Sequence, residues 1–163
     1  MYAANRAAAA LLAVAAFLLF APMAPAEAAP FGLIKDRQLE CLALNVYFES
    51  RAEPRAGQLA VAYTTLNRVH DERFPDTICD VVLQGGETKR GRCQFSWWCD
   101  GRSDAVTETA AWEESVRIAR YALQRRAADP TQGALYFHST GVDPRWSRHM
   151  KLTAKIGRHL FYR

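Results

Sequence analysis

The chain has 163 residues, of which 50% are apolar, and its formal net charge at pH 7 is +4. A chain of this length predicts one domain. The Lys and Arg residues are scattered rather than clustered, and no nucleic-acid-binding motif occurs. Composition and charge therefore argue against a nucleic acid partner.

The N-terminus has the three-part layout of a secretory signal peptide. A basic start at Arg6 precedes an uncharged apolar run over 7–21, and small residues follow at a candidate cleavage site. The run is shorter than the ~20 residues that a membrane-spanning helix needs. We therefore predict a signal peptide over residues 1–26, with cleavage after Ala26 or Ala28, and a periplasmic or secreted protein of the bacterial cell envelope. The alternative is an uncleaved anchor.

The mature domain is expected to span residues 36–163, without a membrane segment and as a monomer. Loss of Arg6 leaves it mildly basic. A basic exported protein is attracted to anionic surfaces, of which the polymers of the cell wall are the obvious example.

Two helices joined by a short turn are predicted at the start of this domain. Asp36 can cap the first helix, whose apolar residues cover most of its girth, as is typical of a central helix. Pro54 disfavours helical geometry in the residue before it, so this helix should end near Arg51 or Ala52. Apolar residues at helical spacing predict the second helix over 57–69.

Shorter elements follow these helices. Residues 81–83 are predicted to form an apolar turn or strand, and the glycine-rich stretch 85–92 an exposed loop. The aromatic stretch 93–101 is expected to be a small hairpin. A third long helix is predicted over 108–127 and a short strand over 134–138. The predicted fold class is thus α+β, mainly helical, with a small β-hairpin.

Four cysteines follow the predicted signal peptide, which suggests two disulfides with three possible pairings. If the first two helices are antiparallel, Cys41 lies near Cys79, while Cys93 and Cys99 bracket one short loop. We therefore favour the pairs Cys41–Cys79 and Cys93–Cys99. A zinc site is the competing hypothesis, but C-x-x-C pairs are lacking and the four histidines form no short ligand motif. We predict neither a metal nor a cofactor.

Glu49 is the candidate for acid–base chemistry. It follows the apolar run 46–48 at the end of the first predicted helix. A carboxyl group that such neighbours partly desolvate has a raised pKa, so it can stay protonated near neutral pH and act as a general acid. The alternative is a solvated glutamate at a helix end, paired with Arg51 or Arg55.

Glu53 is a possible second carboxylate. Glycoside hydrolases commonly use two carboxyl groups at a defined separation. The turn at Pro54 leaves the distance from Glu49 to Glu53 open. We favour a structural role, in which Glu53 binds backbone N–H groups in the turn or caps the second helix.

Aromatic residues gather outside the long predicted helices, accompanied by polar residues. Flat aromatic faces suit the apolar C–H faces of sugar rings, so these residues could line a ligand groove. A small domain also needs aromatic residues in its core, which is the alternative for part of them. The candidates for substrate binding are Gln94, Phe95, Ser96, Tyr136, His138 and Trp146.

Several segments occur in the order found in the SleB-type cell-wall hydrolases, a family named for the spore-cortex-lytic enzyme. The segments are NVYFESRAEPRAGQLAVAYTTLNRV, FPDTICDVV, CQFSW, TQGALYFH, PRWS and KIGRHLFYR. The first two are specific in combination, and the resemblance runs from about residue 38 to the C-terminus.

The resemblance implies a lysozyme-like, mainly helical fold and cleavage of the peptidoglycan glycan strand between N-acetylmuramic acid and N-acetylglucosamine. The family's catalytic glutamate corresponds to Glu49, the first acid of the family pattern E-A-R-G-E. This chain has Ala52 where the pattern has glycine, which bears on the turn but removes no reactive group. The implied mechanism is that of a lytic transglycosylase, in which one group acts as acid and then as base.

Other functions stay open at the level of the sequence. Water could attack the glycosidic bond in place of the muramic acid hydroxyl. A zinc-dependent N-acetylmuramoyl-L-alanine amidase would cut the stem peptide instead, and a non-catalytic module on the same fold would only bind peptidoglycan. The expected partner is the peptidoglycan glycan strand.

Overall fold

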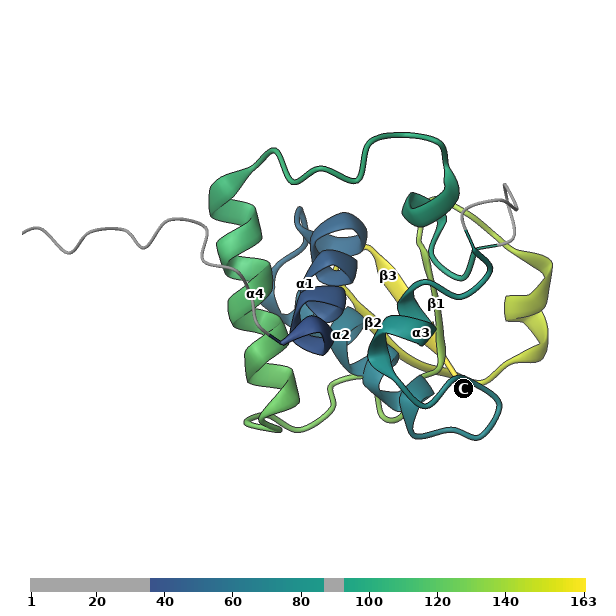
Figure 1. Cartoon of the computed structure of the whole chain (residues 1–163). Coiled ribbons are helices and arrows are strands. Elements are labelled where there is room, and N and C mark those ends of the chain that lie inside the picture. Colours follow the sequence, from purple (N-terminus) through teal and green to yellow (C-terminus); the bar gives the residue numbers. More distant parts are fainter. Residues whose placement is uncertain (1–35, 87–92) are drawn as a thin grey trace, which may run out of the picture. The chain divides into compact units, whose positions relative to one another are not determined.

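The computed structural model describes residues 36–86 and 93–163 (Figure 1). The predicted signal peptide and residues 87–92 of the predicted loop lie outside this part of the chain. The elements in chain order are α1 (Arg37–Ser50), α2 (Arg55–Val69), α3 (Ile78–Val82), the 3-10 helix η1 (Ser96–Cys99), α4 (Thr109–Leu123), β1 (Tyr136–Ser139), the 3-10 helix η2 (Arg145–His149), β2 (Leu152–Ile156) and β3 (His159–Tyr162). In this described part, no helix is long and apolar enough to span a bilayer.

Helix α1 is the centre of the helical part and packs against α2, α3 and α4 (Figure 1). It begins as predicted, where the Asp36 carboxylate accepts hydrogen bonds from the N–H groups of Gln38 and Leu39 at 3.0 and 3.3 Å. Leu42 and Val46 on this helix are completely buried. Neighbours on several sides explain why the helix is apolar over most of its girth.

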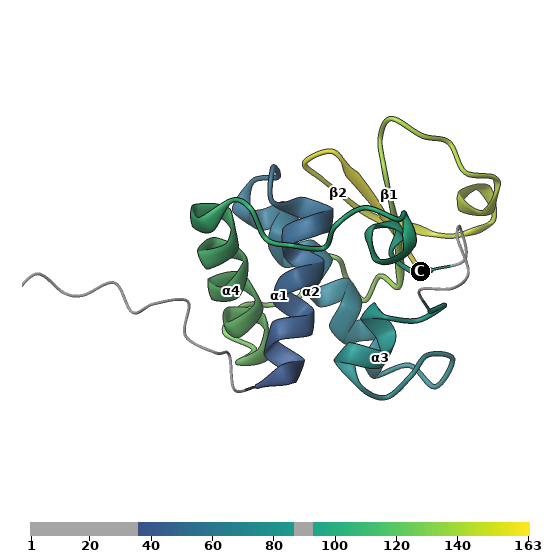
Figure 2. The same cartoon turned by 45° about the horizontal axis from the view of Figure 1, so that its top comes forward.

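The three strands form one antiparallel sheet in the order β1-β3-β2. The sheet lies beside α2, away from α4 (Figure 2). Phe161 of β3 is completely buried with Ala60 of α2 and Ala134, in a second small core cluster. This cluster attaches the sheet to the helices, and the architecture confirms the predicted mainly helical α+β fold.

Two short elements differ from the prediction. The expected hairpin over 93–101 is wrong, since this stretch contains the 3-10 helix η1. A disulfide with a sequence separation of 6 leaves too little chain for two paired strands, and the Gln94 N–H bonds instead to the Gln84 carbonyl at 2.9 Å. The apolar stretch 81–83 falls at the end of α3, where the Thr77 hydroxyl caps the helix by accepting from the Asp80 N–H at 3.1 Å.

Element boundaries also shift. Helix α2 starts at Arg55 rather than at 57, because the Pro54 carbonyl already accepts hydrogen bonds from the first turn. Helix α4 ends at Leu123, before Arg125 with its positive φ of 49°. The strand predicted over 134–138 lies at 136–139. The β2–β3 hairpin is not predicted, since neither strand alternates regularly between buried and exposed positions.

Two disulfides link these elements. Cys41 at the start of α1 is bonded to Cys79 of α3, with a Cα–Cα distance of 5.2 Å, and Cys93 is bonded to Cys99 of η1. These are the two pairs that the sequence favours. The first holds α3 against α1, and the second closes the loop that leads into η1.

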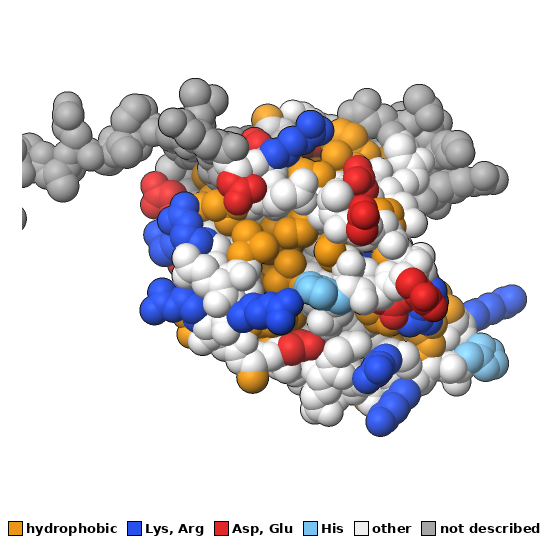
Figure 3. All heavy atoms as spheres, turned by 60° about the horizontal axis from the view of Figure 1, so that its bottom comes forward, with side chains coloured by type: hydrophobic (Ala, Val, Ile, Leu, Met, Phe, Trp, Pro, Cys, Tyr) orange, Lys and Arg blue, Asp and Glu red, His pale blue; other side chains and the backbone are white. Residues whose placement is uncertain are grey.

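Charges of both signs are distributed over the surface. On the face shown in Figure 3, Lys and Arg side chains lie among acidic side chains rather than in one basic patch. An apolar area occupies the middle of the same face. The modest positive charge of the chain is therefore not concentrated there.

The two disulfides should stabilise the fold unequally, because they close loops with sequence separations of 38 and 6. Loop entropy predicts that Cys41→Ala/Cys79→Ala loses about 4 kcal/mol in free energy of unfolding and Cys93→Ala/Cys99→Ala about 2 kcal/mol. Urea denaturation of both double variants measures the difference. Equal losses, or a larger loss for the second pair, would contradict this account.

Candidate active site

Glu49 lies in the last turn of α1, where two open cavities meet. One cavity of about 530 Å³ extends to Glu53 and Arg158, and another of about 560 Å³ extends to Trp97. Both are lined by Phe48, Glu49, Arg51, Ser139 and His159. Because the cavities share these residues, we describe them together as the groove, with Glu49 at its middle.

The Glu49 carboxyl has a strongly shifted pKa. Burial raises its pKa from 4.5 to about 7, and the positive charge of Arg68 opposes part of this rise. The position of Glu49 at the C-terminal end of α1 acts in the same direction as burial, because the negative end of a helix dipole disfavours a carboxylate. Near neutral pH the protonated and ionised forms are therefore both populated, as acid–base chemistry requires.

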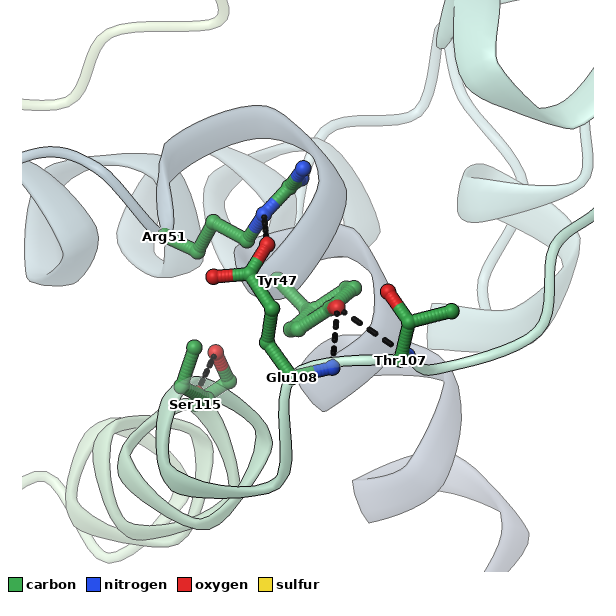
Figure 4. A network of polar contacts seen from close by, with 6 residues as sticks. Tyr47, Arg51, Thr107, Glu108 and Ser115 are labelled. Carbon is green, nitrogen blue, oxygen red and sulfur yellow. Dashed lines mark hydrogen bonds and ion pairs between the residues drawn. The ribbon is translucent and has the colours of Figure 1, made fainter.

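The end of α1 that carries Glu49 is fixed to the start of α4. The hydroxyl of buried Tyr47 accepts hydrogen bonds from the N–H groups of Thr107 and Glu108 at 3.3 and 3.1 Å (Figure 4). Arg51 and Glu108 form an ion pair with an Nε–Oε1 distance of 2.8 Å. Exposed pairs of this kind contribute about 0–1 kcal/mol, so the buried Tyr47 contacts are the stronger tie.

An aromatic wall stands beside Glu49. The rings of Phe48 and Trp97 stack with their centroids 4.6 Å apart. The Trp97 indole N–H donates to the buried side chain of Asn45 at 3.1 Å, and Asn45 in turn donates to the Thr65 hydroxyl at 3.0 Å. The position of Trp97 is therefore determined from α1 and α2, by a polar network inside the core.

The sheet provides the facing wall. Ser139 of β1 and His159 of β3 are direct cross-strand partners, and both line the groove. Burial lowers the pKa of His159 below 6.5, so the ring is neutral at neutral pH. Among the residues that the structure describes, its Nδ1 is buried without a hydrogen-bond partner. The sequence does not single out His159, because only the strand register brings it beside Ser139.

Glu53 has a structural position. Its carboxylate accepts hydrogen bonds from the backbone N–H and the Nε of Arg158, at 2.9 and 2.7 Å. Burial acts to raise the pKa of Glu53, but these hydrogen bonds outweigh it and hold the pKa below its ordinary value. Glu53 thus binds a backbone N–H group, which is one of the two structural roles that the sequence favours for it. Glu53 does not cap α2, whose N-cap is Pro54.

Ala52, the residue that departs from the family pattern, fits the turn between α1 and α2. Within the described chain, the non-glycine residues with a positive φ are Arg125 and Gln132. Ala52 is not among them, so the turn needs no glycine at this position.

Half of the predicted substrate-binding set lies close to Glu49. Gln94, Phe95 and Ser96 line a third cavity of about 210 Å³ together with Glu49 and Arg68. Ser96 also lines the groove, whereas Phe95 is almost completely buried and belongs to the core. The structure therefore brings this predicted segment beside Glu49, while its role in substrate binding stays a prediction.

The other half lies elsewhere. The Trp146 ring packs on Tyr136 and His138, with centroids 5.9 and 5.5 Å apart, and none of the three lines the groove or the third cavity. Successive side chains of a strand point to opposite faces, so Tyr136 and His138 lie on the opposite face of β1 from Phe137 and Ser139. The structure thus places Ser139, rather than His138, beside Glu49.

The fold and the groove define a mainly helical domain that presents a carboxylic acid of raised pKa in an open groove. Over residues 36–86 and 93–163, no three His, Cys, Asp or Glu side chains are grouped as metal ligands. The family profile described as Cell Wall Hydrolase matches residues 52–162. The chain belongs to this cell wall hydrolase family. Glu49 lies just before the matched range, at the end of the helix that precedes it.

Relatives and solved structures agree with this assignment. The chain is 32% identical over 127 residues to the spore cortex-lytic enzyme of Bacillus cereus. This match covers 77% of this chain and 44% of that protein. It is 30% identical over 129 residues to the spore cortex-lytic enzyme of Halalkalibacterium halodurans. This match covers 77% of this chain and 34% of that protein. The chain thus spans less than half the length of these curated relatives.

Two solved structures share the fold. The catalytic domain of the germination-specific lytic transglycosylase SleB from Bacillus anthracis matches with a TM-score of 0.64 and 30% identity, over 82% of this chain and 99% of that chain. The catalytic domain of Bacillus cereus SleB matches with a TM-score of 0.58 and 28% identity, over 77% and 89%. The family resemblance seen in the sequence is therefore confirmed.

The two hydrogen bonds from Arg158 to the Glu53 carboxylate, called the anchor below, depend on Gly157. Gly157 has a φ of 57°, and a Cβ at this position would overlap the Glu53 carboxylate. Gly157→Ala should therefore lose about 2–4 kcal/mol in free energy of unfolding, through backbone strain and loss of the anchor. The matched control is Gly133→Ala, where φ is 81° and the nearest side-chain atom is 3.6 Å away. Equal losses in urea denaturation would contradict the proposed clash.

The same variant should change the pH dependence of stability. The pKa of Glu53 is depressed in the folded state, so its stabilising contribution is complete above the ordinary value of 4.5 and is lost as the pH falls through the folded pKa. Without the anchor, stability should fall less steeply below pH 4.5.

Proposed function

We propose that this protein is an exported peptidoglycan-degrading enzyme that cleaves the bond between N-acetylmuramic acid and N-acetylglucosamine. The observation that carries the proposal is a carboxylic acid with a pKa of about 7 at the middle of an open groove. Membership of the cell wall hydrolase family supports the substrate class. The Bacillus anthracis neighbour, described as a lytic transglycosylase, supports the reaction type. The predicted signal peptide supports a periplasmic or secreted location.

Glu49 acts as acid and then as base. First, its protonated carboxyl donates a proton to the glycosidic oxygen while the bond from that oxygen to C1 of the muramic acid breaks. The resulting carboxylate then accepts the proton of the muramic acid C6 hydroxyl, whose oxygen bonds to C1. The product is a 1,6-anhydro sugar, and Glu49 has regained its proton. This sequence uses no second carboxylate, in agreement with the engagement of Glu53 by Arg158.

The groove walls suit a glycan strand. The stacked rings of Phe48 and Trp97 offer an aromatic surface for the C–H faces of sugar rings. Across the groove, the Ser139 hydroxyl and the neutral His159 ring can exchange hydrogen bonds with sugar hydroxyl or acetamido groups. The two ends of the groove extend away from Glu49, as an enzyme that cuts within a polymer requires.

Replacement of the acid tests the proposal directly. Glu49→Gln keeps the shape of the side chain but removes the transferable proton, so the release of soluble fragments from purified peptidoglycan should fall about 10²–10⁴-fold. Mass spectrometry of the fragments should show anhydro-muropeptides from the mature wild-type protein, with or without EDTA. Glu113→Gln on the exposed side of α4 is the matched control and should retain wild-type activity.

Each other result has a defined meaning. Reducing-end muropeptides would keep Glu49 as the acid but replace the C6 hydroxyl by water. Free stem peptides, lost on chelation, would replace the proposal by an amidase. Binding of the wild-type protein to peptidoglycan without release of any fragment would replace it by a binding module.

The pH dependence of the rate should follow the ionisation of Glu49. The first step needs the protonated carboxyl, whose pKa is about 7. Initial rates of fragment release should therefore fall about tenfold per pH unit on the alkaline side of that value. Measurements between about pH 5 and 9 test this limb. A rate that rises through this range would contradict the role of Glu49 as the acid.

A further inference from the structure

Arg68 is a buried cation close to the proposed active site. It lies near the end of α2, and only 2% of its surface is exposed. Burial lowers its pKa to about 10, so the guanidinium is still charged at neutral pH. Buried charges are rare in proteins unless another group compensates them, and Arg68 therefore needs an explanation.

The compensation of Arg68 comes mainly from neutral groups. Its Nε donates to the Leu135 carbonyl at 2.7 Å. With the amide oxygen of Gln94 turned toward it, Nη1 and Nη2 donate to Gln94 at 3.3 and 3.2 Å. The guanidinium carbon lies 5.4, 5.0 and 5.9 Å from the ring centroids of Phe74, Phe95 and Tyr136. None of the ion pairs found in the described residues includes Arg68.

The third cavity connects this cation to Glu49. Both side chains line the same space of about 210 Å³, which is also lined by Gln94, in the chain segment that leads into η1. Arg68 is almost completely buried, and a charge removed from water acts over a longer distance, because the effective dielectric constant is lower. Arg68 therefore lies where it can favour a negative charge on Glu49 without forming a contact ion pair.

We propose that Arg68 is a positioning residue for proton transfer, a fixed positive charge that stabilises the Glu49 carboxylate formed when the proton passes to the substrate. The inference rests on the proposed function, since it assigns Arg68 to the same acid–base cycle. A contact ion pair would keep Glu49 ionised and block proton donation. A cation held across a cavity leaves the protonated form accessible and still lowers the free energy of the ionised one.

The other charges around Glu49 are already paired, neutral or near solvent. Arg51 of α1 pairs with Glu108, and Arg158 pairs with Glu53. Burial lowers the pKa of His159 of β3 and keeps it neutral. The charged residues that line the groove beyond η1 are Asp100, Arg102 and Asp104. Asp100 and Arg102 are exposed, so solvent screens them. Arg68 is the charge that opposes the effect of burial on the pKa of Glu49.

The test compares variants that remove, keep or neutralise this charge. Arg68→Met removes it, Arg68→Lys keeps it, and Gln94→Glu places a carboxylate against it. Arg120→Met, on the exposed surface of α4, is the matched control for loss of one positive charge. For each variant, the pKa of Glu49 is measured by carboxyl ¹³C NMR, with Glu49→Gln used to assign the signal. The pH–rate profile of fragment release is then recorded.

Arg68→Met should raise the pKa of Glu49 and move the alkaline limb of the rate upward by about 1 pH unit. The rate at the plateau should fall about tenfold, because the carboxylate formed in the transition state loses its stabilising charge. Gln94→Glu should also raise the pKa of Glu49 and move the alkaline limb upward. Arg68→Lys and Arg120→Met should leave the pKa and the limb within about 0.3 pH units of wild type.

The outcomes separate the inference from the proposed function. A purely structural role would lower the rate of Arg68→Met without moving the limb or the Glu49 pKa, and this result would overturn the inference. If Arg68→Met loses its native circular dichroism spectrum, Gln94→Glu decides, and an unchanged Glu49 pKa in that variant would overturn it too. A shifted Glu49 pKa in a protein that releases no anhydro-muropeptides would support the coupling but reject the proposed function.

Discussion

The desolvation of one carboxyl group at the end of α1 is the constraint on which the site depends. Raising the pKa of Glu49 from 4.5 to about 7 means that the ionised form is disfavoured in the folded protein by about 3 kcal/mol. The packing of α1 must offset this free-energy cost. Its completely buried residues, the disulfide at its start and the Tyr47 contacts at its end hold the helix in place. Glu49 is thereby held in a site that is only partly hydrated.

The groove exists because the sheet is docked beside this helix end. Two contacts contribute to the position of the sheet. Phe161 packs against Ala60 and Ala134 in the small apolar cluster, and Glu53 binds Arg158 at the turn between β2 and β3. The first contact is apolar and non-directional, whereas the second fixes the sheet relative to the turn after α1. Together they bring Ser139 and His159 to the side of the groove that faces the aromatic wall.

The two glutamates that follow α1 show how environment separates chemically equal groups. Glu49 loses hydration, and the charge of Arg68 offsets only part of this loss, so its pKa rises. Glu53 is also buried, but two hydrogen bonds from Arg158 stabilise its charged form and its pKa falls. In the proposed mechanism, this difference lets Glu49 transfer a proton while Glu53 has a structural role.

Local sequence determined the long helices, the cap at Asp36, the favoured disulfides and the family, because each depends on residues close in the chain or on a motif. It also singled out Glu49 as the candidate acid, which stays a proposal. It misassigned the stretch 93–101 and missed the β2–β3 hairpin, where short irregular segments carry little periodicity. Only the tertiary structure decided that His159 meets Ser139, that Arg158 binds Glu53 and that Arg68 lies across a cavity from Glu49. These contacts join residues that are far apart in the chain. They are determined by strand register and packing, which local sequence patterns do not predict.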